Sequence, residues 1–586
     1  MRDSQLVSGL YRRRSTPRPI PYALALALFL PVAMTSASAQ APTNPLPIPG
    51  RSVVTTSLGI VAASQPLAAK AGAEILDRGG NAIDAAIAAN AVLGLVEPHM
   101  NGVGGDLFAI VYEASTGKLH GLNASGWAPS GLTPQLLAER GLTRMPNNGI
   151  FAVTVPGAVA GWDALRSRFG TMPFTELLSS AIWYAENGFP VSEVIAGEWA
   201  EAERKLSATP EARATYFLGD RPPRFGEVFR NGNLAATLRR IAAHGRDGFY
   251  RGQTADAIIE LSRTAGGTMT HADLSEFEVQ WQEPIKTTYR GWTVYELPPQ
   301  GQGIAALMML NIMERYPLGE WGFHDPRAMH VMIEAKKLAY ADMLAYVGDP
   351  AFSTVPVQQL LSREHAATRA ARLDLTKAAC DVMPGRIAGL EGVHGGDTIY
   401  LTVIDAEGNI VSLIQSIYSS FGTGLVPSKM GFALHNRGAL FTLDAGHPNT
   451  LAPRKRPLHT IIPAFMEKDG VRIGFGIMGG WTQSQAHAQF VSNIADYGMT
   501  IQQALEAGRF VKNSFRGCDV SIEALVPAAT QSALRALGHE IRVVAPRSDT
   551  FGRGQAVMSL PNGVHFGASE PRHDGAAIPQ GAVRKN

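Results

Sequence analysis

A predicted β-hairpin that begins at Thr398 constrains the fold more than any other stretch of the sequence. Two runs rich in β-branched and aromatic residues flank a turn at Ala406–Asn409, which is the pattern of two adjacent antiparallel strands. Counting back from this turn along the ladder places Thr398 opposite Ile417, within one residue. The hairpin therefore predicts an antiparallel sheet in which Ser416 or Tyr418 lies beside Thr398.

The residues before this hairpin indicate that the chain is cut there. The sequence "HGGD" forms a flexible loop that ends at Asp397. A Thr hydroxyl is a poor nucleophile unless a base lies beside it, and the free α-amine of an N-terminal Thr, which titrates near ~8, supplies one. We predict cleavage between Asp397 and Thr398, with the Ser416 hydroxyl orienting the nucleophile and relaying its proton. The alternative interpretation is a common turn followed by a structural Thr.

Two further stretches carry candidate chemistry. Gly479 and Gly480 follow a strand-like run, and two successive backbone N–H groups there would form an oxyanion hole. A plain turn is the alternative interpretation. The stretch Arg454–Pro463 places three basic residues before His459 and Thr460, for which the alternative is a solvated run of charge.

The rest of the chain mixes helices and strands without a regular alternation. The sequence predicts helices over 64–80, 81–98 and 325–348, with Ser64 and Asn81 as N-caps of the first two. The second helix is apolar nearly all round, so we expect it to be buried against a sheet. Because no steady strand–helix–strand rhythm is present, the pattern indicates α+β layers rather than a doubly wound parallel sheet.

The first 39 residues are predicted to be a secretory signal peptide. A basic start is followed by the short apolar run Tyr22–Leu30 and by small residues at Ala37–Ala39, which is the signature of such a leader. No later segment reaches the ~18 uninterrupted apolar residues that indicate a membrane span. We therefore expect a periplasmic or secreted protein without a membrane span.

The net charge argues against a nucleic-acid-binding protein, and the spacing of the histidines argues against a metal site. The whole chain of 586 residues has a net charge of +2, and removal of a leader with five arginines and one aspartate makes it −2. A nearly neutral protein has no electrostatic surface for nucleic acid. His324, His330, His394 and His447 have no metal-ligand spacing, and we predict neither a metal nor a cofactor.

The two cysteines, Cys380 and Cys518, are too few for a disulfide framework or a cysteine-based zinc site. We expect two free thiols, with a single disulfide as the alternative.

Several motifs along the chain occur in the order of a known family. They are "GGNAIDAAIAANAVLGLVEPHMNGVGGD", "ASGWAP", "PPQGQGIAALMMLNIME", "EAKKLAYAD", "GDTIYLTVIDAEGN", "SSFGTG", "KRPLHTIIP" and "MGG". Together they resemble the γ-glutamyltransferase (glutathione hydrolase) family of N-terminal-nucleophile hydrolases. The resemblance implies a four-layer αββα sandwich that cuts itself into a large chain, 40–397, and a small chain, 398–586, which remain partners. It also implies an acyl-enzyme on Thr398, with Ser416 as the hydroxyl partner and Gly479 and Gly480 as oxyanion donors.

The positions that bind the γ-glutamyl group depart from the family pattern and are similar to its cephalosporin-acylase-like branch. A substrate ammonium against Leu440 would lose water without gaining a partner, at a cost of a few kcal/mol. Arg437 is a candidate for holding a substrate carboxylate from a different direction. At the recognition positions this chain has other residues than the glutamate-binding members of the family. It has Ser125 in place of their Arg, Tyr418 in place of their Asn, Arg437 (after Asn436) in place of their Gln, Leu440 in place of their Asp, and His459 and Thr460 in place of their serine pair.

The sequence leaves three functions open. The family default is hydrolysis or transfer of glutathione or other γ-glutamyl amides. The second is an acylase acting on glutaryl-type or other non-glutamyl amides, which the departures at the recognition positions favour. The third, from another class, is a non-catalytic exported binding protein that kept the fold; the joint presence of Thr398, Ser416 and the glycine pair argues against it.

Overall fold

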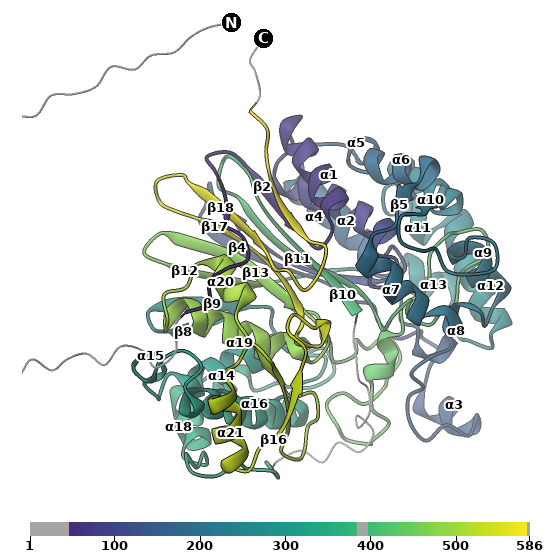
Figure 1. The fold of residues 1–586 in the computed structure, drawn as a ribbon. Helices are drawn as coiled ribbons and strands as arrows, with labels where there is room; N and C mark the ends of the chain where they lie inside the picture. Colours follow the sequence, from purple (N-terminus) through teal and green to yellow (C-terminus); the bar gives the residue numbers. More distant parts are fainter. Residues whose placement is uncertain (1–45, 384–396, 583–586) are drawn as a thin grey trace, which may run out of the picture. The chain divides into compact units, whose positions relative to one another are not determined.

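Two antiparallel β-sheets pack face to face between two layers of helices (Figure 1). The computed structural model describes residues 46–383 and 397–582. Each sheet has seven strands. The predicted α+β, four-layer αββα sandwich is confirmed. The predicted leader lies outside the described residues.

The first sheet contains the hairpin predicted around Thr398. Its ladder pairs Ile404 with Ile410 and Tyr400 with Ile414, and the register shifts between Asp397 and Ile399. The strands, in spatial order, are β19 (Ala576–Pro579), β2 (Ile60–Ala63), β10 (Asp397–Ile404), β11 (Ile410–Tyr418), β3 (Asp106–Glu113), β4 (Lys118–Ala124) and β7 (Gln280–Gln282).

The second sheet packs against the first through contacts of β13 and β17 with β10. It draws strands from both sides of the Asp397–Thr398 bond, so the large-chain and small-chain segments fold together. Its strands, in spatial order, are β1 (Val54–Thr56), β18 (His565–Ser569), β17 (Arg553–Ser559), β13 (Val471–Met478), β12 (Ala464–Lys468), β9 (Trp292–Glu296) and β8 (Ile285–Tyr289).

Helices α1 (Pro66–Asp77), α2 (Ala82–Val96) and α4 (Ala158–Phe169) lie on the outer face of the first sheet. Asn81 caps α2 in a capping box with Asp84, as the sequence predicts. The predicted N-cap of α1 was wrong by one residue. The Gln65 side chain, and not that of Ser64, accepts hydrogen bonds from the N–H groups of the first turn. The other elements on this side are α3 (Pro134–Glu139), η1 (Ile150–Ala152), α5 (Phe174–Leu177), α6 (Ser179–Asn187), β5 (Phe189–Pro190), α7 (Glu193–Glu201), α8 (Glu203–Leu206), α9 (Pro210–Tyr216), β6 (Val228–Phe229), α10 (Gly232–His244), α11 (Asp247–Tyr250), α12 (Gly252–Thr264) and α13 (His271–Ser275).

Helices α14 (Gly303–Met313), α19 (Thr482–Ala495) and α20 (Ile501–Glu506) cover the second sheet. The long helix α16 (Pro326–Tyr346) packs on α14 and begins at the cap Asp325, as the sequence predicts. The remaining elements are α15 (Leu318–Trp321), α17 (Val357–Leu360), α18 (Arg363–Ala370), η2 (Arg437–Leu440), β14 (Phe510–Val511), β15 (Asp519–Glu523), α21 (Ala528–Ala536), β16 (Glu540–Val544) and η3 (Asp549–Phe551).

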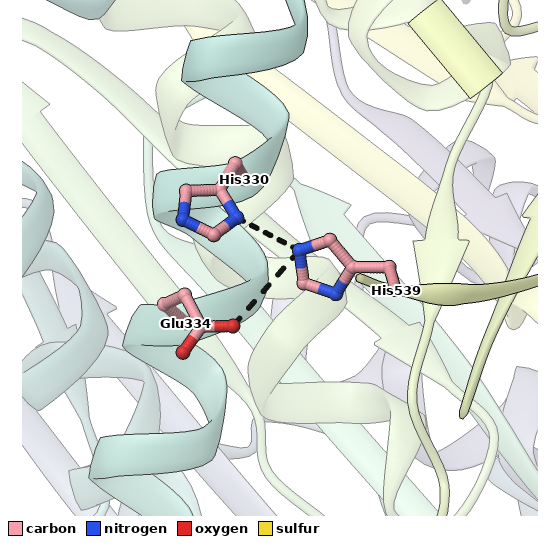
Figure 2. Close-up of side chains that lie close together, drawn as sticks. All are labelled: His330, Glu334 and His539. Atoms are coloured by element: carbon pink, nitrogen blue, oxygen red, sulfur yellow. Dashed lines mark hydrogen bonds and ion pairs between the residues drawn. The ribbon is translucent and has the colours of Figure 1, made fainter. Parts of the chain in front are cut away.

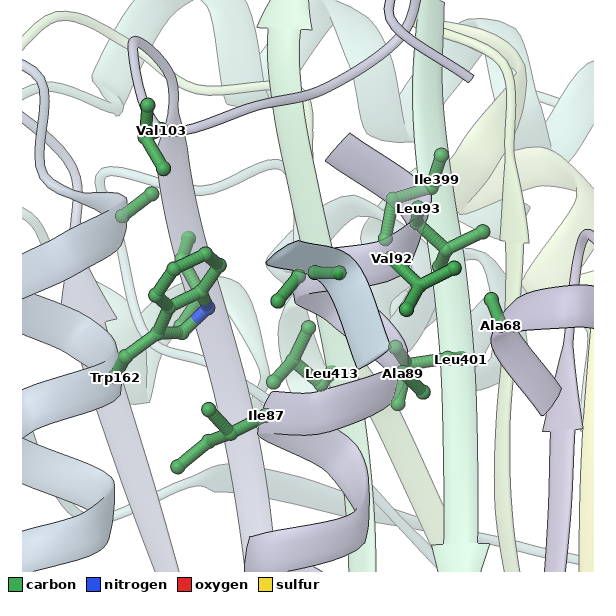
Figure 3. Packing of buried hydrophobic residues seen from close by; sticks show 14 of the residues in the cluster. Ala68, Ile87, Ala89, Val92, Leu93, Val103, Trp162, Ile399, Leu401 and Leu413 are labelled. Carbon is green, nitrogen blue, oxygen red and sulfur yellow. The ribbon is translucent and has the colours of Figure 1, made fainter. Parts of the chain in front are cut away.

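The core between α2 and the first sheet explains why that helix is apolar on every side. Val92 and Leu93 are buried against Ile399 and Leu401 of β10, the strand that carries Thr398 (Figure 3). Burying one such side chain stabilises the fold by ~1.5–3 kcal/mol. The strand that carries Thr398 is thereby packed against a buried helix. Among the described residues, no helix is both long and apolar enough to cross a bilayer.

The expectation of two free thiols was wrong. Cys380 and Cys518 form a disulfide with their Cα atoms 4.7 Å apart. The two residues are separated by 138 positions in the sequence, so spacing alone could not show that the fold brings them together.

Candidate active site

Thr398 and Ser416 lie side by side at the start of the hairpin. The Thr398 Oγ1 donates to the Ser416 Oγ at 3.3 Å, and the same Ser416 Oγ accepts the backbone N–H of Tyr418 at 2.8 Å. Both hydroxyl-bearing residues are buried. The register irregularity between Asp397 and Ile399 falls at Thr398, and such bulges re-aim a side chain. The predicted neighbourhood of Thr398 is therefore observed.

A cavity of about 590 Å³ opens at Thr398. Gly479, which follows the last residue of β13, lines the same cavity. Polar and charged side chains, among them Asn513, Asp519 and Arg553, form much of the remaining wall. Thr398 thus lines a chamber large enough for a small amide substrate.

Gly479 and Gly480 make a turn that only glycine adopts readily. Their φ angles are 135° and 55°, values at which a side chain would strain the backbone. A Cβ on Gly479 would also lie 3.2 Å from the Cα of Gly552. The turn connects β13 to α19, so its two successive N–H groups belong to backbone fixed by a strand and a helix. This geometry suits the predicted oxyanion donors.

Asp106 is a site residue that the sequence reasoning did not single out, although it ends the quoted motif "NGVGGD". It lies opposite Ser416 in the ladder between β3 and β11. Its Oδ2 is 2.6 Å from the His459 Nε2 and 3.1 Å from the Arg437 Nε. Thr398, Ser416 and Asp106 therefore form a row across three neighbouring strands.

The charges around Asp106 compensate one another inside the protein. Burial alone would raise the pKa of Asp106, but Arg437, His459 and His435 together hold it well below its usual range. Burial, with Arg437 nearby, lowers the pKa of His459 to about 4. The cluster therefore contains a carboxylate, a guanidinium and a neutral imidazole at neutral pH.

Four of the predicted substrate-binding residues meet at this cluster. Arg437 donates through Nη1 to the Thr460 Oγ1 at 2.7 Å, and its guanidinium lies 4.7 Å from the centre of the Tyr418 ring. Tyr418 has a positive φ of 76° and a buried hydroxyl with no hydrogen-bond partner among the described residues. His459 contacts the same carboxylate, that of Asp106. Arg437 is thus already paired, which weighs against its expected role as a free carboxylate binder.

The other predicted recognition residues lie around the cluster. Leu440 is completely buried at the end of η2. Asn436 binds the backbone N–H of Ser419 at 3.1 Å through its side-chain oxygen. The Ser125 hydroxyl donates to Asn123 and accepts from Gln300, each at 2.7 Å. These side chains hold loops together in the structure, and none of the three carries a charge.

A family model matches most of the chain. The model described as gamma-glutamyltranspeptidase matches residues 68–580. The chain belongs to this family. The glutathione hydrolase-like YwrD proenzyme of Bacillus subtilis (strain 168) is 36% identical over 90% of the chain and 99% of that protein. The oxamate amidohydrolase proenzyme of Klebsiella pneumoniae is also 36% identical, over 89% of the chain and 98% of that protein.

A solved structure of the same family has the same fold throughout. A cephalosporin acylase from Bacillus halodurans superposes with a TM-score of 0.85 and 41% identity, covering 92% of this chain and 98% of that one. The chain is therefore a member of the gamma-glutamyltranspeptidase family of enzymes, which are amide hydrolases and acyltransferases. The predicted family membership is confirmed.

This family member also contains a polar cluster that the sequence did not reveal. His330 and Glu334, one turn apart on α16, meet His539, with ligand atoms within 4.8 Å of one another (Figure 2). The His330 Nδ1 and His539 Nε2 are 2.8 Å apart, and Glu334 binds the Lys337 ammonium at 2.7 Å. Because that ammonium already neutralises Glu334, we describe the cluster as a buried hydrogen-bond and ion-pair network.

The remaining histidines singled out from the sequence have structural contacts. His324 binds the Gly508 carbonyl and His447 binds the Leu344 carbonyl, each at 2.9 Å. His394 lies outside the described residues.

Proposed function

We propose that the chain cuts itself between Asp397 and Thr398 and then hydrolyses or transfers the acyl group of small amides through an acyl-enzyme on Thr398. One observation carries this proposal: Thr398 donates a hydrogen bond to Ser416 and lines the same cavity as Gly479. The large chain would comprise 40–397 and the small chain 398–586.

Self-cleavage uses the same hydroxyl as turnover. The Thr398 Oγ attacks the Asp397 carbonyl carbon, the C–N bond breaks, and an ester joins the two residues while the nitrogen becomes the new α-amine. Water then hydrolyses the ester and frees both the Asp397 carboxylate and the Thr398 hydroxyl. Ser416, 3.3 Å from that hydroxyl, is placed to orient it and to pass its proton.

In turnover the new α-amine acts as the base. It takes the Thr398 proton as Oγ attacks the substrate carbonyl, and the oxyanion is bound by the N–H groups of Gly479 and Gly480. The amine leaving group departs with that proton and leaves an acyl ester on Thr398. Water completes hydrolysis, or a second amine takes the acyl group in transfer.

The substrate proposed first is glutathione or another γ-glutamyl amide. The family model and the glutathione hydrolase-like relative support it. A binding mode for the γ-glutamyl α-ammonium must then use a group other than residue 440, where the chain has Leu. The Tyr418 hydroxyl, which is buried beside Arg437 and has no hydrogen-bond partner among the described residues, is the candidate that we propose for this group.

A glutaryl-type or other non-glutamyl amide is the second candidate. Leu440 offers no charge for an ammonium, and Arg437 is already paired with Asp106. The cephalosporin acylase structure and the oxamate amidohydrolase relative support this candidate because their names denote non-glutamyl amides. No cofactor takes part in either reaction as proposed.

We also propose that the mature enzyme acts in the periplasm or outside the cell. The predicted leader supports export, and the Cys380–Cys518 disulfide fits an oxidising compartment.

The test begins with mass spectrometry of the wild type and of Thr398→Ala. We expect two chains, the smaller starting at Thr398, from the wild type, and a single chain from the variant. A wild type that remains uncut contradicts the proposal. The cut enzyme is then given γ-glutamyl-p-nitroanilide and glutaryl-p-nitroanilide, which differ by the α-amine. A strong preference for the first supports the γ-glutamyl substrate, and equal or faster turnover of the second supports the acylase.

A further inference from the structure

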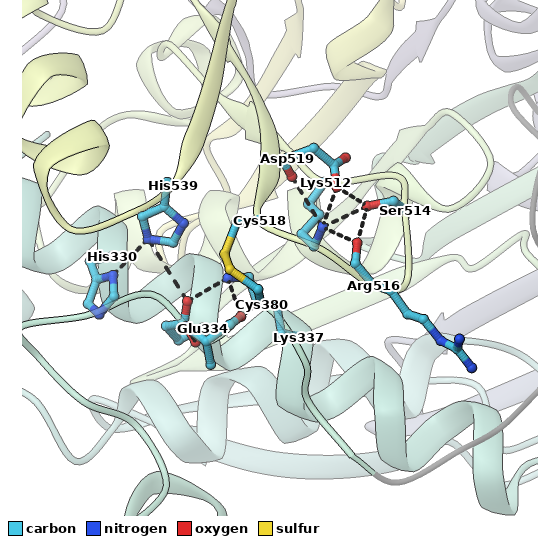
Figure 4. The surroundings of a disulfide bond; sticks show 11 residues. His330, Glu334, Lys337, Cys380, Lys512, Ser514, Arg516, Cys518, Asp519 and His539 are labelled. Carbon is cyan, nitrogen blue, oxygen red and sulfur yellow. Dashed lines mark hydrogen bonds and ion pairs between the residues drawn. A yellow bond between two sulfur atoms is a disulfide. The ribbon is translucent and has the colours of Figure 1, made fainter.

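The single disulfide spans the proposed cleavage point. Cys380 follows α18, and Cys518 directly precedes β15 (Figure 4). A cut between residues 397 and 398 therefore leaves one cysteine in each chain. We infer that in the mature enzyme Cys380–Cys518 is a covalent bond between the large and small chains, and that it positions one wall of the substrate cavity. The inference rests on the proposed cleavage site.

Cys518 lies within the segment that forms this wall. Asn513, Ser514 and Asp519, on either side of Cys518, line the cavity that opens at Thr398. The disulfide is reinforced by a hydrogen bond, because the Gly517 N–H donates to the Cys380 carbonyl at 2.9 Å. Residue 380 of the large chain thus holds the small-chain turn by a covalent bond and by its backbone.

Hydrogen bonds within residues 512–519, the small-chain turn that contains Cys518, also hold this turn together. The Lys512 Nζ donates to the Ser514 Oγ at 2.6 Å, the Arg516 carbonyl at 2.9 Å and the Asp519 Oδ1 at 2.8 Å. One ammonium therefore links residues near both ends of the turn, Ser514 and Asp519. The position of this turn relative to Thr398 then depends on what anchors it to the rest of the protein.

On the large chain, the residue next to Cys380 is hydrogen-bonded to helix α16. Ala379, next to Cys380, accepts from Lys337 at 2.8 Å and donates to Glu334 at 3.3 Å. Both partners belong to α16, and Glu334 also belongs to the network with His539 shown in Figure 2. The disulfide therefore connects the cavity wall to a helix that packs against α14 and α21.

Cleavage changes what the disulfide does. In the uncut chain it closes a loop, whereas after the cut it prevents the two chains from separating when they unfold. A tether of this kind keeps the partner at a high effective concentration.

The first experiment compares gels of the matured enzyme with and without reductant, after alkylation of free thiols. We expect one band without reductant and two with it. The control Thr398→Ala should give one band in both lanes. Two bands without reductant would overturn the interchain bond, whereas one band with reductant would show instead that cleavage itself had failed.

The second experiment tests positioning with the double variant Cys380→Ser/Cys518→Ser. Because the cavity wall is no longer held by the disulfide, the KM for the better nitroanilide substrate should rise about three- to tenfold while kcat stays within twofold. Wild-type enzyme treated with a phosphine reductant should show the same change, and reductant should not alter the double variant further. If the variant does not fold, the reduced wild type decides. An unchanged KM, or a fall in kcat alone, would overturn the positioning role.

Discussion

Arg437 and Asp106 form a completely buried ion pair beside Ser416. The Nε–Oδ2 distance is 3.1 Å and the Nη2–Oδ1 distance is 3.3 Å. Asp106 belongs to β3 of the large-chain segment and Arg437 to η2 of the small-chain segment. The pair therefore joins the two segments directly behind Ser416, the ladder partner of Asp106.

Removing one member of this pair should be costly. Asp106→Asn leaves the Arg437 charge buried without a counter-ion, which typically lowers the free energy of unfolding by ~3–5 kcal/mol. Urea denaturation of the uncut Thr398→Ala background measures this without interference from cleavage. The double variant Asp106→Asn/Arg437→Met should recover part of the loss, and strictly additive effects would contradict a coupled pair.

The sequence predicts the hairpin and the layers well because both depend on local patterns. Thr398 and Ser416 lie on adjacent strands joined by the short turn at residues 405–409, so counting along the ladder is enough to place them together. The N-cap of α2 was equally local, since Asn81 and Asp84 satisfy each other. The family motifs then supplied the order of the layers.

The contacts that sequence reasoning missed join residues far apart in the chain. Asp106 meets Arg437 across 331 positions, and Cys380 meets Cys518 across 138. Neither hydrophobic periodicity nor a turn motif shows that two residues so far apart in the sequence are in contact. The only available signal for Asp106 was an acidic residue at the end of a glycine-rich motif, directly before a buried strand.

The unpartnered Tyr418 hydroxyl gives a second prediction. Tyr418→Phe removes a buried hydroxyl that has no partner among the described residues, so the melting temperature should not fall. If bound substrate forms a hydrogen bond with the Tyr418 hydroxyl, the KM of the variant should rise about fivefold, in line with ~1 kcal/mol for one hydrogen bond. Tyr400→Phe is the matched control, because its hydroxyl is bonded to Ser412 at 2.8 Å. It should lose stability and keep its KM.

Acid should destabilise the fold through buried neutral histidines. Burial lowers the pKa of His487 to about 3, and its Nε2 accepts the Ile477 N–H, so it cannot take a proton there without losing that bond. The unfolded chain binds the proton first, below pH ~6.5. The stability that neutral His487 contributes is therefore complete above that pH and is lost as the pH falls toward 3.

Each such histidine should reduce the free energy of unfolding by up to ~1.4 kcal/mol per pH unit in this window. His487→Gln retains an acceptor for Ile477 and does not titrate, so its melting temperature should fall less steeply between pH 7 and pH 5. His271, which is 61% exposed, provides the control variant His271→Asn. Identical slopes for all three proteins would count against this account.

Metal removal should leave the enzyme unchanged. The His330, Glu334 and His539 cluster has the geometry of three ligands, but the Lys337 ammonium lies 2.7 Å from the Glu334 carboxylate. A divalent cation would have to displace that charge from a buried position. Dialysis against a chelator should therefore alter neither turnover nor melting temperature. A loss that added zinc restores would show that the cluster binds metal.

Ser416 should matter for both cleavage and turnover. Ser416→Ala removes the partner of the Thr398 hydroxyl at 3.3 Å and the acceptor of the Tyr418 N–H at 2.8 Å. Because a positioned group of this kind contributes ~10²–10⁴-fold, we expect self-cleavage to slow by at least about a hundredfold. Gel densitometry over time measures it. Ser412→Ala, on the same strand but bonded to Tyr400, should mature at close to the wild-type rate, and equal slowing by both variants would mean that any serine lost from β11 impairs folding rather than chemistry.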